Sequence, residues 1–166
     1  MSCQWALTLY LYIGRIRPRR IVGTGYNGGM NAILVNDCGY TTFESKLIRS
    51  AFELLPLCVG NKSRHISFLC KKKRILSWGV NRENDTHPLA QRFSYINSAV
   101  HSELDALVKL KSYHVNYSQL SIFNIRIDRY HRVCLSKPCR RCMNLLIAFD
   151  VKKVYYTDEN GQFITL

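Results

Sequence analysis

The sequence has no apolar run long enough to cross a lipid bilayer, which takes about 20 predominantly apolar residues in a helix. Acidic residues are also scarce: 11 Asp and Glu stand against 24 Lys and Arg, and the formal net charge is +13. We therefore expect no membrane partner, and the positive charge favours polyanionic partners such as nucleotides or nucleic acids. Charge describes association rather than chemistry, so the reaction has to be inferred from specific residues.

A disulfide framework is missing too. The seven cysteines are odd in number and irregularly spaced, which is typical of a reducing, cytoplasmic compartment. The apolar run 5–13 has no positive charge before it, and basic residues follow it where a signal peptide has small residues, so we expect a buried strand. Only Cys139 and Cys142 form a close pair, and the lack of a second pair argues against a four-cysteine zinc site.

Apolar periodicity divides residues 43–166 into alternating helices and strands. The predicted helices cover 43–56, 98–112 and a segment that starts near 138, and the predicted strands cover 66–70, 75–80, 122–128, 151–157 and 162–166. Residues 81–97 are predicted as a polar loop and 129–137 as a basic loop. Asn160-Gly161 lies between two apolar runs, which predicts a hairpin and antiparallel pairing of the last two strands.

Residues 1–42 are predicted as a β-rich extension that precedes the main domain at 43–166. Residues 19–27 resemble residues 73–81, because each segment follows a basic turn and ends in Gly-x-Asn. The extension could therefore be a second copy of one hairpin or an extra sheet edge, and chance similarity of two hairpins is an equal alternative.

Two distant motifs carry the chemistry: His101-Ser102-Glu103, and Pro138-Cys139-Arg140-Arg141-Cys142. One imidazole and two thiolates suit Zn²⁺ and leave the fourth tetrahedral position open, as in catalytic zinc sites. Two cysteines three residues apart at a helix start point the same way, and the helix amino end stabilises thiolates. Glu103 is too close to His101 to be a comfortable ligand and fits better beside a metal-bound water. A structural zinc site and a redox cysteine pair are the alternatives.

These motifs resemble those of the cytidine/deoxycytidylate deaminase superfamily of zinc hydrolases, over residues 43–166. Ser102 stands where the family usually has Ala. The resemblance implies a three-layer α/β/α fold, with a mixed sheet of about five strands whose last two are antiparallel. It also implies Zn²⁺ as cofactor and assembly into dimers or larger oligomers.

The same resemblance implies roles for individual residues. The metal ligands would be His101, Cys139 and Cys142, and Glu103 would move protons between water, the cytosine ring and the leaving ammonia. The substrate contacts would be Asn81, Ser102, Pro138 and Arg126, with Asn27 as a rival of Asn81. Arg126 belongs to a group of basic residues, near the metal motifs in sequence, that could hold a phosphate.

Three functions fit the motifs. A deaminase of free cytosine nucleosides or nucleotides is preferred, because polynucleotide deaminases of this superfamily commonly have a helix between the last two strands and this chain has a hairpin signal. The alternative is a deaminase that acts on cytosine or adenine in DNA or RNA, with single-stranded nucleic acid as partner. The third is a non-catalytic, zinc-stabilised binding module, against which an intact Glu103 argues.

Overall fold

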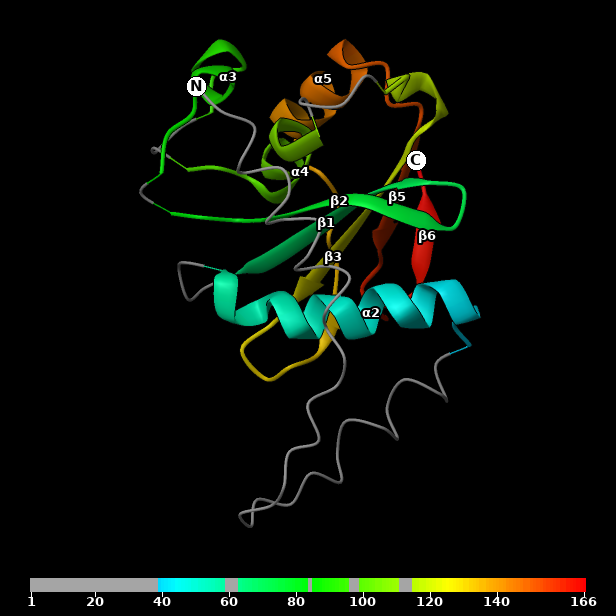
Figure 1. Cartoon of the computed structure of the whole chain (residues 1–166). Helices are drawn as coiled ribbons and strands as arrows, with labels where there is room; N and C mark the ends of the chain where they lie inside the picture. The colour runs from blue at the N-terminus through cyan, green and yellow to red at the C-terminus, as the bar shows by residue number, and fades with distance from the viewer. Residues whose placement is uncertain (1–38, 59–62, 84, 96–98, 111–114) are drawn as a thin grey trace, which may run out of the picture. The chain divides into compact units, whose positions relative to one another are not determined.

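The computed structural model describes residues 39–58, 63–83, 85–95, 99–110 and 115–166 (Figure 1). The predicted extension at 1–42, apart from its last four residues, and Asn27 lie outside this described part. No helix in the described ranges has the length and apolar character that a membrane span requires.

A six-stranded mixed sheet forms the centre of the described chain. Its strands are β1 (Arg64–Lys71), β2 (Arg74–Val80), β3 (Ser121–Ile127), β4 (Val133–Cys134), β5 (Lys153–Thr157) and β6 (Phe163–Thr165). The order is β2-β1-β3-β5-β6, with the short β4 paired to β3. Strands β3 and β5 are parallel, whereas the other pairs, including β5 and β6, are antiparallel. The predicted mixed sheet with an antiparallel final pair is thus confirmed, and β4 is an addition inside the segment predicted as a basic loop.

Helices cover both faces of this sheet, as Figure 1 shows. They are α2 (Thr42–Leu54), α3 (Pro88–Arg92), α4 (Ser102–Leu110) and α5 (Arg140–Ala148), with 3₁₀ turns η1 (Leu55–Leu57) and η2 (Tyr117–Gln119). Helix α2 packs with one apolar cluster, to which β3 contributes Phe123, Ile125 and Ile127. Helices α4 and α5 pack with a second cluster, on the opposite face, which contains Ile122. The strict alternation along β3 therefore produces the predicted three-layer α/β/α fold.

Helix α2 begins almost where the sequence predicts, because a capping box closes its amino end. The Thr41 hydroxyl accepts a hydrogen bond from the Glu44 amide at 3.3 Å, and the Glu44 carboxylate accepts one from the Thr41 amide at 2.8 Å. Two of the unpaired donors at the helix start are satisfied in this way.

Helix α4 starts four residues later than predicted. Val100 is not helical, because it pairs with Arg82 in an isolated β-bridge through hydrogen bonds of 2.9 and 3.0 Å. Val100 and Leu104 have helical spacing in the sequence, but the backbone amide and carbonyl of Val100 form hydrogen bonds with Arg82 and not within a helix. His101 consequently precedes the helix and its carbonyl accepts the first intrahelical bond, from the Asp105 amide at 3.0 Å.

The segment predicted as a polar loop at 81–97 contains the short helix α3. Pro88 occupies its first turn, where a missing amide proton costs nothing. The His87 ring nitrogen Nδ1 accepts a hydrogen bond from the Leu89 amide at 3.1 Å and caps the helix. The prediction of a loop was wrong here because one turn and a half of helix carries no periodicity that can be read from sequence.

The first turn of α4 lies directly on the end of β2. Gly79 makes this approach possible, since a Cβ added there would lie 2.1 Å from the Ser102 carbonyl oxygen and 2.3 Å from the Ala106 nitrogen. The buried Asp105 carboxylate then joins the two elements: it accepts hydrogen bonds from the Val80 amide at 3.0 Å and from Arg82 at 2.9 Å. The position of residues 101–103 relative to β2 is set by these contacts.

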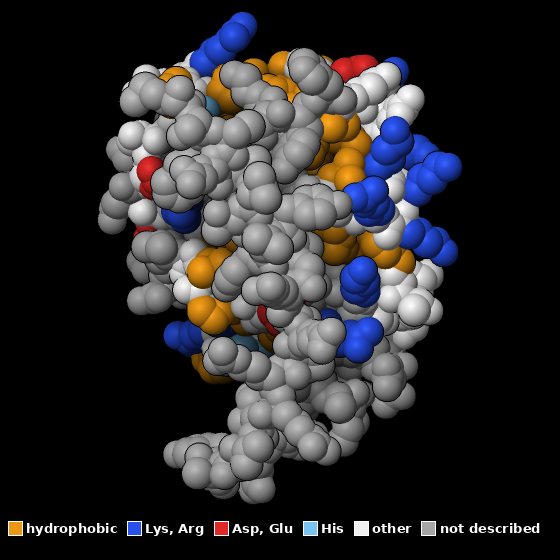
Figure 2. Space-filling model, viewed as in Figure 1, with side chains coloured by type: hydrophobic (Ala, Val, Ile, Leu, Met, Phe, Trp, Pro, Cys, Tyr) orange, Lys and Arg blue, Asp and Glu red, His pale blue; other side chains and the backbone are white. Residues whose placement is uncertain are grey.

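The excess of basic residues is visible on the surface. Figure 2 shows Lys and Arg side chains gathered along one side of the face in view, where few acidic side chains accompany them. The hairpin tip between β1 and β2 contributes four exposed basic residues, Lys71, Lys72, Lys73 and Arg74. These side chains lie on a solvent-exposed turn.

We predict that Gly79→Ala lowers the free energy of unfolding by about 1–3 kcal/mol or more, because the new methyl group collides with the backbone of α4 rather than with a flexible side chain. Urea denaturation of the two proteins measures this change. An unchanged transition midpoint would contradict the close approach of β2 and α4.

Candidate metal centre and active site

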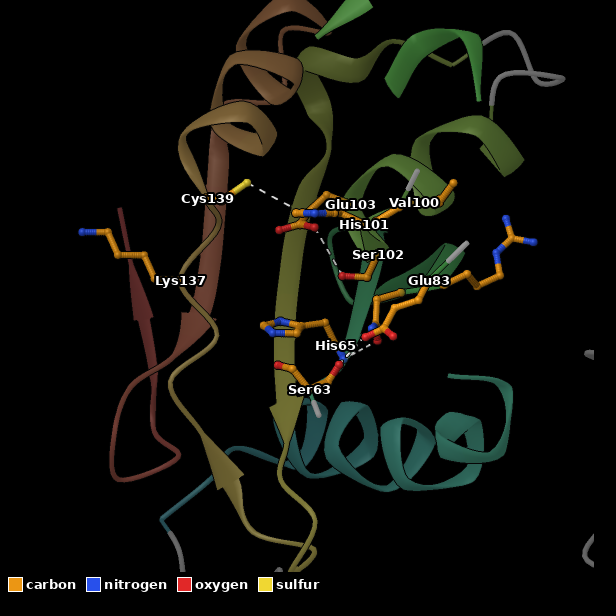
Figure 3. Close-up of a pocket in the computed structure, with 12 residues that line it drawn as sticks. Ser63, His65, Glu83, Val100, His101, Ser102, Glu103, Lys137 and Cys139 are labelled. Carbon is orange, nitrogen blue, oxygen red and sulfur yellow. Dashed lines mark hydrogen bonds between the residues drawn. The ribbon is translucent and has the colours of Figure 1, made fainter. Parts of the chain in front are cut away.

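Two helix amino ends bring the predicted metal-binding side chains together. His101 immediately precedes α4, Cys139 is the N-cap of α5, and Cys142 lies in the first turn of α5. The His101 Nδ1 atom is 3.3 Å from the Cys142 sulfur and 3.7 Å from the Cys139 sulfur. The three donor atoms all lie within 4.8 Å of one another. Figure 3 shows the Cys139 sulfur pointing toward the His101 ring.

These distances fit a tetrahedral zinc ion. With zinc–nitrogen bonds of about 2.0–2.1 Å and zinc–sulfur bonds of about 2.3 Å, neighbouring ligand atoms are about 3.5–3.8 Å apart. The separation of 3.7 Å between Cys139 and His101 lies in this range, and the separation of 3.3 Å between Cys142 and His101 is slightly shorter. One imidazole and two sulfurs also match the preference of zinc for nitrogen and sulfur ligands. His101, Cys139 and Cys142 could therefore hold zinc and leave a fourth position open.

The hydrogen bond between the two cysteines shifts their pKa values in opposite directions. The hydrogen bond from Cys142, supported by one from His101, lowers the pKa of the Cys139 thiol to about 3. The hydrogen bond to Cys139 and the burial of its own sulfur raise the pKa of Cys142. Zinc binds cysteine as thiolate, so binding of the metal would release the proton that Cys142 holds.

Glu103 lies beside this cluster, in the first turn of α4, and its side chain is buried (5% exposed). Asn124 of β3 donates a hydrogen bond to its Oε1 atom at 3.0 Å, and the Ser102 hydroxyl is 3.3 Å from Oε2. The Ser67 hydroxyl donates to the Asn124 Oδ1 atom at 2.8 Å and lies 2.7 Å from the Ser102 hydroxyl. The carboxylate is thus held by polar groups from three elements of the fold.

Burial raises the pKa of the Glu103 carboxyl, and the nearby His101 opposes this rise. A carboxyl with a raised pKa exchanges protons closer to neutral pH, which suits a group that both accepts and donates a proton. Asn124 and Ser67 were not singled out from the sequence as site residues. The only signal for Asn124 is its position on β3, where it faces away from Phe123 and Ile125 and toward the site.

A cavity of about 370 Å³ opens next to His101 and Glu103 (Figure 3). It is lined by Ser63, His65, Asn81, Arg82, Glu83, Ala99, Val100, His101, Ser102, Glu103, Lys137 and Cys139. This volume is typical of a small-molecule site. Of the predicted substrate contacts, Asn81 and Ser102 line the cavity, whereas the buried Pro138 and the partly buried Arg126 are not among its lining residues.

Asn81 is already engaged by the protein. Its Oδ1 atom accepts a hydrogen bond from the His65 amide at 2.8 Å, and its Nδ2 group donates to the Ser63 carbonyl at 2.8 Å. These two bonds connect Asn81, which directly follows β2, to Ser63 and His65 at the start of β1. Asn81 therefore both lines the cavity and holds the start of β1 in place beside it.

His65 and Glu83 were missed by the sequence analysis, because neither belongs to a recognisable motif. Burial, together with the positive charge of Arg126, lowers the pKa of the His65 ring to about 4, so this imidazole is neutral at physiological pH. Arg126 sits directly opposite His65 in the register of β1 and β3. The cavity thus combines a neutral ring with the Glu83 carboxylate and the Lys137 ammonium.

Comparison with known proteins agrees with this geometry. The family model of the cytidine and deoxycytidylate deaminase zinc-binding region matches residues 44–158. A search of curated proteins finds no significant match. Cytidine deaminase from Mycobacterium leprae is similar in structure, with a TM-score of 0.52 and 18% identity over 76% of this chain and 94% of its own.

Two further solved structures are similar. Cytidine deaminase from Burkholderia pseudomallei has a TM-score of 0.52 and 16% identity, over 73% of this chain and 89% of its own. The dCMP deaminase from cyanophage S-TIM5, in complex with dCMP and dUMP, has a TM-score of 0.49 and 19% identity, over 72% of this chain and 84% of its own. At these identities, the two cytidine deaminases establish likeness of fold.

We predict that Cys139→Ala and Cys142→Ala each reduce bound zinc from about one ion per chain to near zero, because two remaining ligands hold zinc weakly. Metal analysis of the purified proteins measures the ratio. Cys134→Ala is the matched control, since Cys134 is a partly buried free cysteine on β4, and this variant should keep its metal. About one zinc per chain in either of the first two variants would contradict the ligand assignment.

Proposed function

The chain belongs to the cytidine and deoxycytidylate deaminase family, and on that premise we propose that it is a hydrolytic deaminase of free cytosine nucleosides or nucleotides. In this proposal His101, Cys139 and Cys142 are the zinc ligands, and Glu103 is the catalytic acid and base. The observation that carries it is the buried Glu103 carboxylate beside the three-residue cluster, at the wall of a cavity sized for a small molecule.

The reaction follows from these positions. Zinc bound by the cluster supplies a Lewis acid and a nucleophilic water at neutral pH. Glu103 accepts a proton from the attacking water and transfers it to N3 of the cytosine ring, while a bond forms between the water oxygen and C4. Glu103 then passes the second proton of that water to the amino group, and the C4–N4 bond breaks to release ammonia. The products are uracil and ammonia, and Glu103 returns to its starting state.

The hydrogen bonds around Glu103 support this double role. Asn124 and Ser102 each donate a hydrogen bond to one of the two carboxylate oxygens, and these bonds orient the Glu103 carboxylate. Hydrogen bonds donated to a carboxylate stabilise its ionised form, which is the form that begins the proposed reaction. Burial acts in the opposite direction and raises the pKa of Glu103, which makes the protonated form accessible when the proton is transferred. A single carboxylate can then work as base and as acid at one pH.

A free nucleoside or nucleotide is favoured by two features. Strands β5 and β6 are antiparallel neighbours, joined by a turn between Asp158 and Gln162 rather than by a helix. The cavity is lined by side chains that suit hydroxyl and amide groups, including Glu83, His65 and Ser63, together with the cation Lys137. Asn81, Ser102, Pro138 and Arg126 remain the proposed substrate contacts, of which the first two line this cavity.

Deamination within a nucleic acid is the second candidate, and the net charge of +13 is the observation in its favour. Several of the basic residues near the metal motifs are otherwise occupied. Arg132 pairs with Asp128 at 2.8 Å, and Arg129 and Arg132 both lie over the Tyr130 ring. Lys137 lines the cavity and Arg129 and Arg132 do not, so Lys137 is the better candidate for a phosphate contact.

We predict that the purified protein releases ammonia from cytidine, deoxycytidine or dCMP, and that Glu103→Gln lowers kcat by about 10²-fold or more while zinc stays bound. Assays on these substrates and on single-stranded DNA and RNA, run side by side, measure the preference. Glu53→Gln, on the exposed side of α2, is the matched control and should retain full activity. Turnover of the polymers alone would overturn the substrate class, and an active Glu103→Gln variant would overturn the role of Glu103.

We predict that Asn124→Ala keeps zinc but moves the acid limb of the pH–rate profile to higher pH. Loss of a hydrogen bond to the ionised carboxylate raises the pKa of Glu103 further, so more of the base is protonated at any given acidic pH. Ser136→Ala is the control, because Ser136 donates to the Asn124 carbonyl at 2.7 Å and its loss disturbs the same strand without touching Glu103. Equal shifts in both variants would contradict a direct effect of Asn124 on the carboxylate.

A further inference from the structure

A tyrosine outside both sequence motifs contacts the candidate metal centre. The Tyr95 hydroxyl lies 3.1 Å from the Cys142 sulfur. Its ring stands edge-on to the His101 ring, with a centroid distance of 4.8 Å and an interplanar angle of 88°. One side chain therefore touches two of the three proposed zinc ligands, and it comes from the segment after α3 rather than from α4 or α5.

The backbone fixes Tyr95 in this place. Helix α3 ends in a Schellman motif, in which the Tyr95 amide donates to the Ala90 carbonyl at 2.9 Å and the Ser94 amide donates to the Gln91 carbonyl at 3.0 Å. Ser94 takes the left-handed conformation that this motif requires, with a φ of 56°. The Tyr95 ring also packs against the apolar cluster under α4 and α5. The hydroxyl is thus held in position by the fold and does not depend on the metal site for its orientation.

The direction of the hydrogen bond follows from the chemistry of the two groups. A cysteine that binds zinc is a thiolate, which has no proton to donate, so the tyrosine hydroxyl must be the donor.

We propose that Tyr95 is a positioning residue of the metal centre, which orients Cys142 and withdraws charge from its thiolate. The inference rests on the proposed function only in taking the cluster as a metal site. Two thiolates cancel the double positive charge of zinc, which weakens the metal as a Lewis acid. A hydrogen bond to one sulfur removes part of the charge that this sulfur donates and restores some of the lost acidity. Partners outside the ligand shell commonly tune metal sites in this way.

The test compares the cobalt-substituted forms of the wild-type protein, Tyr95→Phe and Tyr117→Phe. Cobalt reports on thiolate ligands through a sulfur-to-metal charge-transfer band in the near ultraviolet, and a hydrogen bond to the sulfur moves this band to higher energy. Phenylalanine keeps the ring against His101 and removes only the donor. Tyr117, whose ring packs edge-on against Phe149 at 5.4 Å in the same apolar cluster, is the matched control.

We expect the band of Tyr95→Phe to move to longer wavelength, while the band of Tyr117→Phe coincides with that of the wild type. A Tyr95→Phe spectrum identical to the wild type would overturn the inference, and so would an equal shift in both variants. The absence of any thiolate-to-cobalt band in the wild-type protein would overturn the metal centre and this inference with it. Because the measurement needs no substrate, a protein that fails to deaminate cytosine would sink the proposed function and leave this test unaffected.

Discussion

The close contact between the end of β2 and the first turn of α4 is the constraint on which the rest of the site depends. Gly79 lets the helix backbone approach the strand, and the buried Asp105 carboxylate holds the Val80 amide and the Arg82 guanidinium. This junction places His101 and Glu103 at one wall of the cavity and Asn81 at another. A displacement of the helix would move the proposed base and one proposed ligand together, because both belong to the same turn.

The interior of the site contains four buried polar side chains. Glu103, Asn124, Ser67 and Ser102 are all buried, and each finds a partner in the same network. Unsatisfied, any one of them would cost about 1–3 kcal/mol, so the network is stable only when α4, β1 and β3 are correctly placed together. The same hydrogen bonds that satisfy these groups also orient the carboxylate for the proposed proton transfer, so stability and the proposed function depend on one set of contacts.

Much of the fold could be predicted from sequence, and each error has an identifiable physical cause. Helix α2 was predicted closely, since Thr41 and Glu44 form a capping box that needs no tertiary partner. The start of α4 was predicted too early, because Val100 fits the helical period but pairs with Arg82 across space. Helix α3 and strand β4 are too short to show a period. Tyr95 and Asn124 were not recognised as parts of the site, because neither residue type nor spacing marks them and only the fold brings them to Cys142 and Glu103.

The sequence by itself determined the chemistry that is available, because His-x-Glu and Pro-Cys-x-x-Cys specify the donor types and their spacing along two helix starts. Family membership and the three-layer fold follow from the same pattern. Only the tertiary structure decided which groups surround that chemistry: the amide that holds Glu103, the phenol at Cys142, and the His65 and Glu83 side chains in the cavity. The reason is physical, since ligand spacing is a local property of the chain, whereas the surroundings of a buried charge depend on segments that meet only when the sheet and its helices pack together.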